Sequence, residues 1–156
     1  MSQCWMIAIL SAGSPHKGNY TEISVMAING SDFIDSARSC LEQDDEVGYR
    51  SCISRAYYGM FHEAMASLKH VPYYSSDRHR SLISYMTSTA ECKQEPYDKH
   101  KLKVMGYKLK QMRDSRNEAD YDIARVTISK EMADSGIASA DLFFSEWAAL
   151  KQSGAS

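Results

Sequence analysis

The sequence has few residues that break helices. Its 156 residues include only three prolines and eight glycines, and Pro15 and two of the glycines fall in the first twenty residues. No segment alternates polar and apolar residues as half-buried strands do. The chain therefore predicts an all-α domain, an up-and-down bundle of four to five helices. We expect an irregular N-terminal arm over residues 1–30, the bundle over residues 31–150 and a flexible tail over residues 151–156.

A membrane-spanning run is also missing. The longest apolar stretch near the N-terminus, residues 5–10, is much shorter than the roughly 18 residues that a spanning helix needs. It lacks the basic flank and small-residue cleavage pattern of a secretion signal. We therefore expect a cytoplasmic protein that does not enter a membrane.

The sequence lacks the spacings of common metal and phosphate sites. Its four cysteines are scattered, and its five histidines are never three or four residues apart. No two glycines have the spacing of a phosphate-binding loop before a helix, and no nucleophile elbow is present. We expect reduced cysteines, no metal and no cofactor, and these absences argue against the familiar nucleotide hydrolases.

Apolar residues recur at helical spacing in five segments. The second of them carries its apolar residues within one face of about 140°, which is typical of a core helix. A Ser-Ser-Asp sequence at 75–77 predicts the start of the third segment, and Pro96 marks the loop before the fourth. The predicted helices cover about residues 31–41, 46–69, 78–90, 99–119 and 127–150.

The fourth predicted helix is the most basic part of the chain. The formal net charge of −2 neither suggests nor excludes a nucleic-acid partner. Residues 99–116, however, contain five Lys and two Arg against Asp114 alone. Lys103 and Lys110 lie on one flank of this helix with Lys99. Such a strip is either an ordinary solvated face or part of a site for a phosphate-rich ligand.

Two charges fall on the apolar stripe of this helix. Arg116 lies at the centre of the stripe, and Asp120 lies about 40° from it, four residues on. A charge on a core-facing stripe costs several kcal/mol unless it is paired or lies in a water-lined cleft. The two side chains therefore either form a structural ion pair or line a pocket, with Arg113 and Asn117 on the adjoining flank. The stripe consists of Leu102, Met105, Leu109 and Met112, and continues to Ala119 and Ile123 if the helix extends that far.

One arginine and two histidines are further candidates for site residues. Arg55 and His62 are seven residues apart on the second helix, so they lie within about 20° of each other. Both fall opposite the apolar face, so we expect them to be exposed. His79, which stands between Arg78 and Arg80, is also expected to be exposed and not catalytic.

Two segments together resemble HEPN domains. Residues 54–62 read SRAYYGMFH, and residues 113–121 read RDSRNEADY. The likeness is to the small stand-alone prokaryotic branch and extends over about residues 32–150. It implies a helical bundle, often a homodimer, whose polar cluster faces a cleft at the dimer interface. It also implies metal-independent ribonuclease activity and a minimal nucleotidyltransferase as antitoxin partner.

The active family pattern is an Arg followed, after four to six residues, by a His. Arg116 and Asn117 match the beginning of this pattern, but Tyr121 stands where the His is expected. A Tyr with an ordinary pKa of about 10 is a poor base at neutral pH. Tyr121 could instead position substrate, Asp120 could act as base if its pKa were raised, or His62 could enter the cleft. The resemblance implies catalytic candidates Arg116, Asn117, Asp120 and Tyr121, and RNA- or nucleotide-binding candidates Arg113, Lys103 and Lys110.

These residues support two hypotheses from different classes. The first is an RNA- or nucleotide-binding HEPN-like protein that serves as the ribonuclease toxin of a toxin–antitoxin or defence module. The second is a non-catalytic interaction protein that docks a nucleotidyltransferase partner, which the missing His favours.

Overall fold

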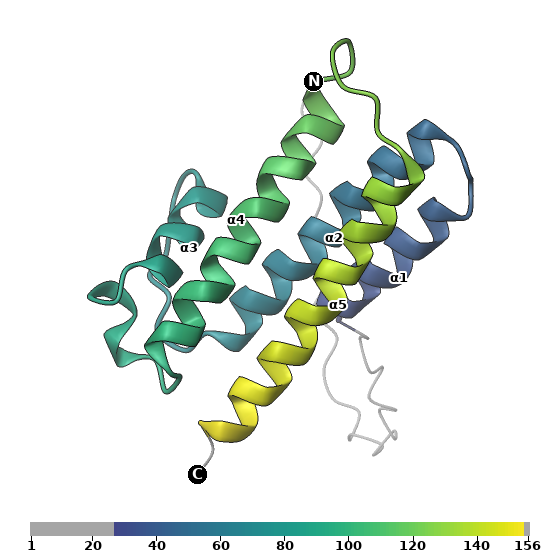
Figure 1. Cartoon of the computed structure of the whole chain (residues 1–156). Helices are drawn as coiled ribbons and strands as arrows, with labels where there is room; N and C mark the ends of the chain where they lie inside the picture. Colours follow the sequence, from purple (N-terminus) through teal and green to yellow (C-terminus); the bar gives the residue numbers. More distant parts are fainter. Residues whose placement is uncertain (1–26, 155–156) are drawn as a thin grey trace, which may run out of the picture.

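The protein is an all-helical bundle in the computed structural model, which describes residues 27–154. In Figure 1 helices α1, α2, α4 and α5 lie side by side and run alternately in opposite directions, and the shorter α3 lies beside α4. The prediction of an all-α up-and-down bundle is therefore confirmed. Residues 1–26 of the predicted arm lie outside the described residues. The helices are α1 (Gly30–Leu41), α2 (Glu46–Ser67), α3 (Arg78–Thr87), the 3-10 helix η1 (Glu91–Gln94), α4 (Lys99–Tyr121) and α5 (Lys130–Ser153).

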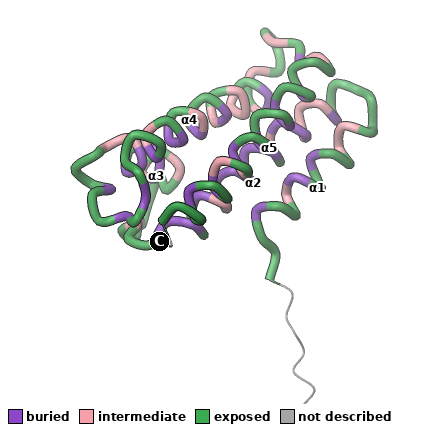
Figure 2. The backbone as a smooth tube through the Cα atoms, turned by 60° about the horizontal axis from the view of Figure 1, so that its bottom comes forward, coloured by how far each residue is buried: buried purple, intermediate pink, exposed green. Residues whose placement is uncertain are grey.

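Helix α2 is the centre of the bundle, because it packs against α1, α4 and α5. Figure 2 shows buried residues concentrated on the faces that these helices turn toward one another. The largest fully buried side chains are Trp147 of α5, Tyr57 of α2 and Tyr85 of α3. None of the helices in the described part of the chain has a stretch both long and apolar enough to cross a bilayer.

Two glycines allow α1 and α2 to approach closely. A Cβ atom on Gly30 would lie 2.7 Å from the carbonyl oxygen of Gly59, and one on Gly59 would lie 2.5 Å from Ile34 Cδ1. Real Cβ atoms do not approach other atoms so closely, so glycine is required for this backbone contact. This close contact between the two helix backbones fixes the position of α1 against α2.

Local capping residues define where the long helices begin. Asn29 forms a capping box with Asp32 at the start of α1, and its Oδ1 accepts a hydrogen bond from Ser31 N at 2.8 Å. Asp98 caps α4 by accepting from the backbone N–H of Lys101. Ser129 caps α5, so this helix begins at Lys130, three residues later than predicted.

Helix α2 ends two residues before the predicted boundary at 69. The backbone N–H groups of Lys69 and His70 donate to the carboxylate of Glu95 at 2.9 and 2.8 Å instead of continuing the helix. The Tyr85 hydroxyl donates to the same carboxylate at 2.8 Å, and Glu95 is only 4 % exposed. Glu95 therefore terminates α2 and ties it to η1 and α3. Helix α3 also ends earlier than predicted, at Thr87, and η1 follows it.

The C-terminal ends of α4 and α5 also differ from the prediction. Helix α4 ends at Tyr121, two residues beyond the predicted end, so the apolar stripe stops at Ala119 and Ile123 is 72 % exposed. Helix α5 continues to Ser153 rather than ending near 150. An ion pair between Lys151 and Glu63 of α2 holds this last turn against the bundle.

Candidate functional site

Arg116 is the centre of a polar cluster between α4 and α2. Its side chain is 17 % exposed. Nε lies 2.8 Å from Asp120 Oδ2, Nη2 donates to the Tyr58 hydroxyl at 3.1 Å, and Nη1 donates to Asn117 Oδ1 at 3.3 Å. The expectation that Arg116 and Asp120 either pair or line a pocket is met by pairing. We call these four residues, together with Tyr121, the Arg116 surface.

The ion pair is an electrostatic contact and not a hydrogen bond. The Nε–H is not directed at the Asp120 carboxylate, so the contact is electrostatic and Nε has no hydrogen-bond partner among the described residues. Asp120 also accepts a hydrogen bond from Ser54 Oγ at 3.1 Å. The guanidinium carbon lies 5.5 Å from the ring centroid of Tyr58 and 5.0 Å from that of Tyr121. Two aromatic rings and a carboxylate thus hold the cation in place.

The charge on Arg116 is stable. Burial disfavours the charged guanidinium, but Tyr121 and the Asp120 carboxylate outweigh this effect and raise the pKa of Arg116 above its ordinary value. An arginine is already charged at any physiological pH. Arg116 is therefore a fixed cation with restricted freedom, which is suited to an anionic ligand.

His79 of α3 belongs to the same neighbourhood, so the expectation that it is exposed is wrong. It is half-buried, and its Nδ1 lies 2.7 Å from the Tyr57 hydroxyl. Its ring centroid lies 4.3 Å from that of Phe61. The same imidazole ring meets the Tyr58 ring edge-on, with the two centroids 5.9 Å apart. Burial lowers the pKa of His79, and the positive charges of Arg113 and Arg116 lower it further. The imidazole is therefore neutral at pH 7.

Asp77 positions the start of α3. Its backbone has a φ of 45°, in the left-handed region, and its side chain forms no cap hydrogen bond, although the sequence predicted a cap there. The carboxylate instead pairs with Arg80 at 3.2 Å and lies 4.0 Å from Arg113. Arg113, 25 % exposed, thus lies beside the start of α3 as well as one turn before Arg116.

The two predicted lysines are not part of the cluster. Lys110 forms an ion pair with Asp114 at 2.8 Å on the exposed face of α4. Lys103 lies on the same helix roughly 20 Å from Arg116 along the axis, given a rise of 1.5 Å per residue. The structure therefore brings together Arg116, Asn117, Asp120 and Tyr121, places Arg113 beside them, and leaves the lysines apart.

Arg55 and His62 are exposed, as predicted. His62 stacks on Phe33 of α1, with ring centroids 4.9 Å apart and planes inclined by 20°. Phe33 in turn lies 6.2 Å from Tyr58, the residue that contacts Arg116. A row of aromatic rings therefore leads from the Arg116 surface to His62.

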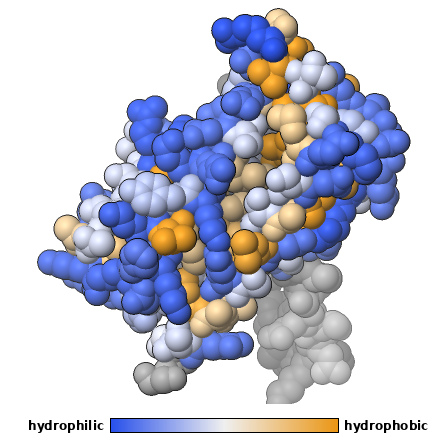
Figure 3. All heavy atoms as spheres, viewed as in Figure 1, coloured by the Kyte–Doolittle hydropathy of each residue, from blue (hydrophilic) through white to orange (hydrophobic). Residues whose placement is uncertain are grey.

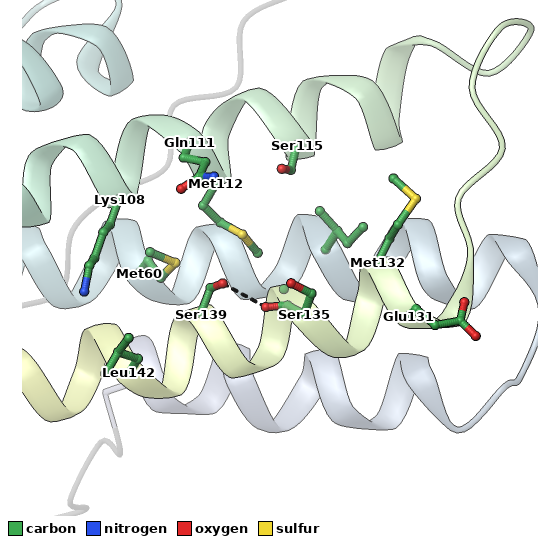
Figure 4. A pocket seen from close by; sticks show the side chains of 12 residues that line it. Met60, Lys108, Gln111, Met112, Ser115, Glu131, Met132, Ser135, Ser139 and Leu142 are labelled. Carbon is green, nitrogen blue, oxygen red and sulfur yellow. Dashed lines mark hydrogen bonds between the residues drawn. The ribbon is translucent and has the colours of Figure 1, made fainter.

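A separate cavity lies between α2, α4 and α5 (Figure 4). Its volume is about 430 Å³, and its walls combine methionines with serine hydroxyls. In Figure 3 apolar side chains gather in this hollow between α4 and α5. At one end Lys108 is paired with Glu146, so its charge is neutralised. None of the predicted site residues lines the cavity, and the candidate site remains the Arg116 surface. Residues lining the cavity include Met60, Met112, Ser115, Ser135, Ser139 and Leu142.

Sequence reasoning missed three residues of this site. Ser54 and Tyr58 lie four residues apart in the segment 54–62, so their shared face of α2 could have been found from spacing. That this face meets Arg116 depends on how α2 packs against α4. No local signal places His79, because its position depends on the path of the chain between α2 and α3. Among residues 27–154, no three His, Cys, Asp or Glu side chains gather as metal ligands.

Comparison with known protein families agrees with the helical fold. The family model described as HEPN domain matches residues 28–150, which include all five helices apart from the last turn of α5. A search of curated proteins finds no match to the chain.

Proposed function

The chain belongs to the HEPN family, and from this premise we propose that it binds RNA through the Arg116 surface. The observation that carries the proposal is the partly exposed Arg116 guanidinium, which is held by Asp120 and by contacts with the rings of Tyr58 and Tyr121. A guanidinium in fixed orientation binds phosphate oxygens with little further loss of entropy. Arg113 adds a second cation one turn away, beside α3. A phosphate-rich ligand is the partner that this charge arrangement fits.

Cleavage of RNA is the activity that we propose for this surface. Attack of the ribose 2′-oxygen on phosphorus breaks the bond to the 5′-oxygen and leaves a cyclic phosphate and a 5′-hydroxyl. Arg116 would stabilise the charge that develops on the phosphorane. The 2′-hydroxyl proton needs an acceptor, and the leaving 5′-oxygen needs a proton. Since Tyr121 replaces the family's His, Asp120 and His79 are the titratable groups to test for these proton transfers.

A cellular role follows from this activity. We propose that the protein acts in the cytoplasm as the toxin of a toxin–antitoxin or defence module, paired with a minimal nucleotidyltransferase. We also propose a homodimer with the Arg116 surface at its interface. Tyr121 and Ile123, which lie at the end of α4, are 71 % and 72 % exposed and support a protein contact at this edge.

RNA binding is tested with the Arg116→Ala variant and a matched Arg38→Ala control. Arg38 is also paired with an aspartate, Asp141, but on the α1–α5 side of the bundle. We expect Arg116→Ala to weaken binding to labelled RNA at least about tenfold, and Arg38→Ala to leave it unchanged. Equal affinities for the wild type and Arg116→Ala would exclude this surface as the RNA site.

Cleavage is tested with the same proteins and structured RNAs in EDTA, followed by analysis of the fragment ends. Cyclic phosphate ends produced by the wild type and not by Arg116→Ala would establish a metal-independent ribonuclease. Binding without cleavage would leave the second candidate, an adaptor that docks a nucleotidyltransferase. The absence of any histidine after His100 favours that candidate. Expression in cells separates the two, because only the nuclease should arrest growth and lose this effect in Arg116→Ala.

A further inference from the structure

One face of α2 carries polar and aromatic residues that are at least partly exposed. Arg55, Tyr58 and His62 recur at a spacing of three and four residues, so they lie on the same side of the helix. None of the three is buried. Phe33 of α1 borders this face on one side, and Arg116 of α4 borders it on the other. The face therefore connects directly to the Arg116 surface.

One pair of rings on this face is nearly parallel, unlike the edge-on pairs around Trp147 in the core. In the core, Trp147 meets Tyr97 and Phe143 edge-on, with interplanar angles of 79° and 78°. Phe33 and His62 instead lie nearly parallel, at 20°, although His62 is exposed. An exposed ring in a parallel stack presents a flat surface to solvent. Another flat ring can extend such a stack.

Two arginines, Arg55 and Arg116, lie along this face of α2. Arg55 is exposed and forms no ion pair with any residue of the described part of the chain. Arg116 lies at the other end of the row, in contact with Tyr58. Parallel aromatic rings flanked by arginines match the chemistry of a single-stranded nucleic acid, in which bases are free to stack and phosphates follow at each side.

We propose that His62 and Phe33 form a stacking platform for one unpaired base of single-stranded RNA, whose flanking phosphates contact Arg55 and Arg116. This inference rests on the proposed function, because it assigns the form of RNA that the Arg116 surface binds. Duplex RNA does not fit the platform, since its bases are stacked within the helix. The platform selects single strands without selecting a sequence, because every base has a flat face.

The experiment uses the full chain and two fluorescently labelled probes. One is a short unstructured RNA, and the other is the same RNA with abasic ribose at every position. The variants are His62→Ala, which removes the ring, and His62→Phe, which keeps an aromatic ring without the imidazole. His100→Ala is the matched control, because His100 is also exposed but lies at the start of α4. Thermal melting of each variant confirms that it is folded.

We expect His62→Ala to weaken binding to the intact RNA about tenfold and to leave the weaker binding to abasic RNA unchanged. His62→Phe and His100→Ala should bind both probes as the wild type does. Unchanged affinity of His62→Ala for intact RNA, or an equal loss for both probes, would overturn the platform. If Arg116→Ala still weakens binding in that case, the proposed function stands and only the platform fails. If no variant or wild type binds RNA, both fail.

Discussion

The Tyr57 hydroxyl and Nδ1 of His79 lie 2.7 Å apart and join the middle of α2 to the first turn of α3. Tyr57 is 1 % exposed, and burial raises its pKa, so the phenol remains protonated. No other hydrogen bond to this hydroxyl is present within residues 27–154. Tyr57 therefore donates to Nδ1, and we assign the imidazole proton to Nε2. The bond fixes the orientation of the imidazole beside the Arg116 surface.

Stability should fall in mild acid because of His79. Its pKa in the folded protein lies below the ordinary value of 6.5, because burial and two nearby arginines disfavour the imidazolium. As pH falls below about 6.5, the unfolded chain gains a proton that the folded protein does not bind, so the free energy of unfolding decreases. Urea denaturation at about pH 7.5 and about pH 5.5 measures this difference. His79→Gln should show a smaller difference, and an equal one would contradict the assignment.

Acidic groups should contribute to this acid sensitivity only at lower pH. Hydrogen bonds from Arg50 and from the backbone of Ile128 lower the pKa of Glu46 below 4.5, and local hydrogen bonds at the start of α5 do the same for Glu131. These carboxylates favour folding above pH 4.5, and this contribution is lost as pH falls through their folded pKa values. The interval between 6.5 and 4.5 therefore reports on His79.

The Arg116–Asp120 pair should be energetically coupled. Both side chains are partly exposed, at 17 % and 25 %, so loss of either should cost less than the roughly 3–5 kcal/mol of a fully buried pair. A double-mutant cycle with Arg116→Ala and Asp120→Asn should give a coupling of about 0.5–2 kcal/mol in the free energy of unfolding. A single-mutant cost in the fully buried range would indicate that the pair serves the fold more than a ligand.

Glu95 should be the most sensitive carboxylate for stability. Glu95→Ala removes the acceptor of two backbone N–H groups and of the Tyr85 hydroxyl in a buried position. We expect a loss of about 2–4 kcal/mol in the free energy of unfolding, because buried donors are left unpaired. Glu91→Ala is the matched control, since Glu91 is exposed at the start of η1, the helix that Glu95 directly follows. Similar melting temperatures for the two variants would disprove this role.

Two glycine substitutions in helices should have opposite effects. Alanine favours helix over glycine by about 1 kcal/mol. At Gly59 the new Cβ would lie 2.9 Å from the backbone oxygen of Gly30, so Gly59→Ala should lower the free energy of unfolding by about 1–3 kcal/mol. At Gly136 the nearest atom is the flexible Met112 Cε at 3.2 Å, beside the cavity, so Gly136→Ala should be neutral or slightly stabilising. Chemical denaturation of the pair checks both signs.

The fold could be predicted to the extent that it is encoded locally. The apolar faces of α2, α3 and α5 follow from residue spacing. The apolar residues at this spacing in α3 are all buried, namely Leu82, Ile83, Tyr85 and Met86. Helix ends could not be predicted where distant residues determine them. The end of α2 depends on Glu95, more than twenty residues away, whose carboxylate takes the N–H groups that another turn of helix would have used.

In the candidate site too, local contacts could be predicted from the sequence and contacts between distant residues could not. Arg116 and Asp120 lie one helical turn apart, so the sequence allows the pairing that the structure shows. The contact of Arg116 with Tyr58 joins different helices, and that of Tyr57 with His79 crosses the loop between α2 and α3. Such contacts depend on packing, which spacing does not reveal. Lys103 and Lys110 lie close to Arg116 in the sequence, but the length of α4 separates Lys103 from Arg116.

Helix α3 has only ten residues and packs mainly against α4 and η1, whereas Arg116 belongs to the four-helix core. A short appended helix opens at a lower free-energy cost than the whole bundle. Opening of α3 would carry His79 and Asp77 away while Arg116, Tyr58 and the aromatic stack stay in place. In native-state hydrogen exchange, the amides of α3 should therefore exchange earlier than those of α2. The part of the site that contains His79 and Asp77 therefore has a lower local stability than the part that contains Arg116.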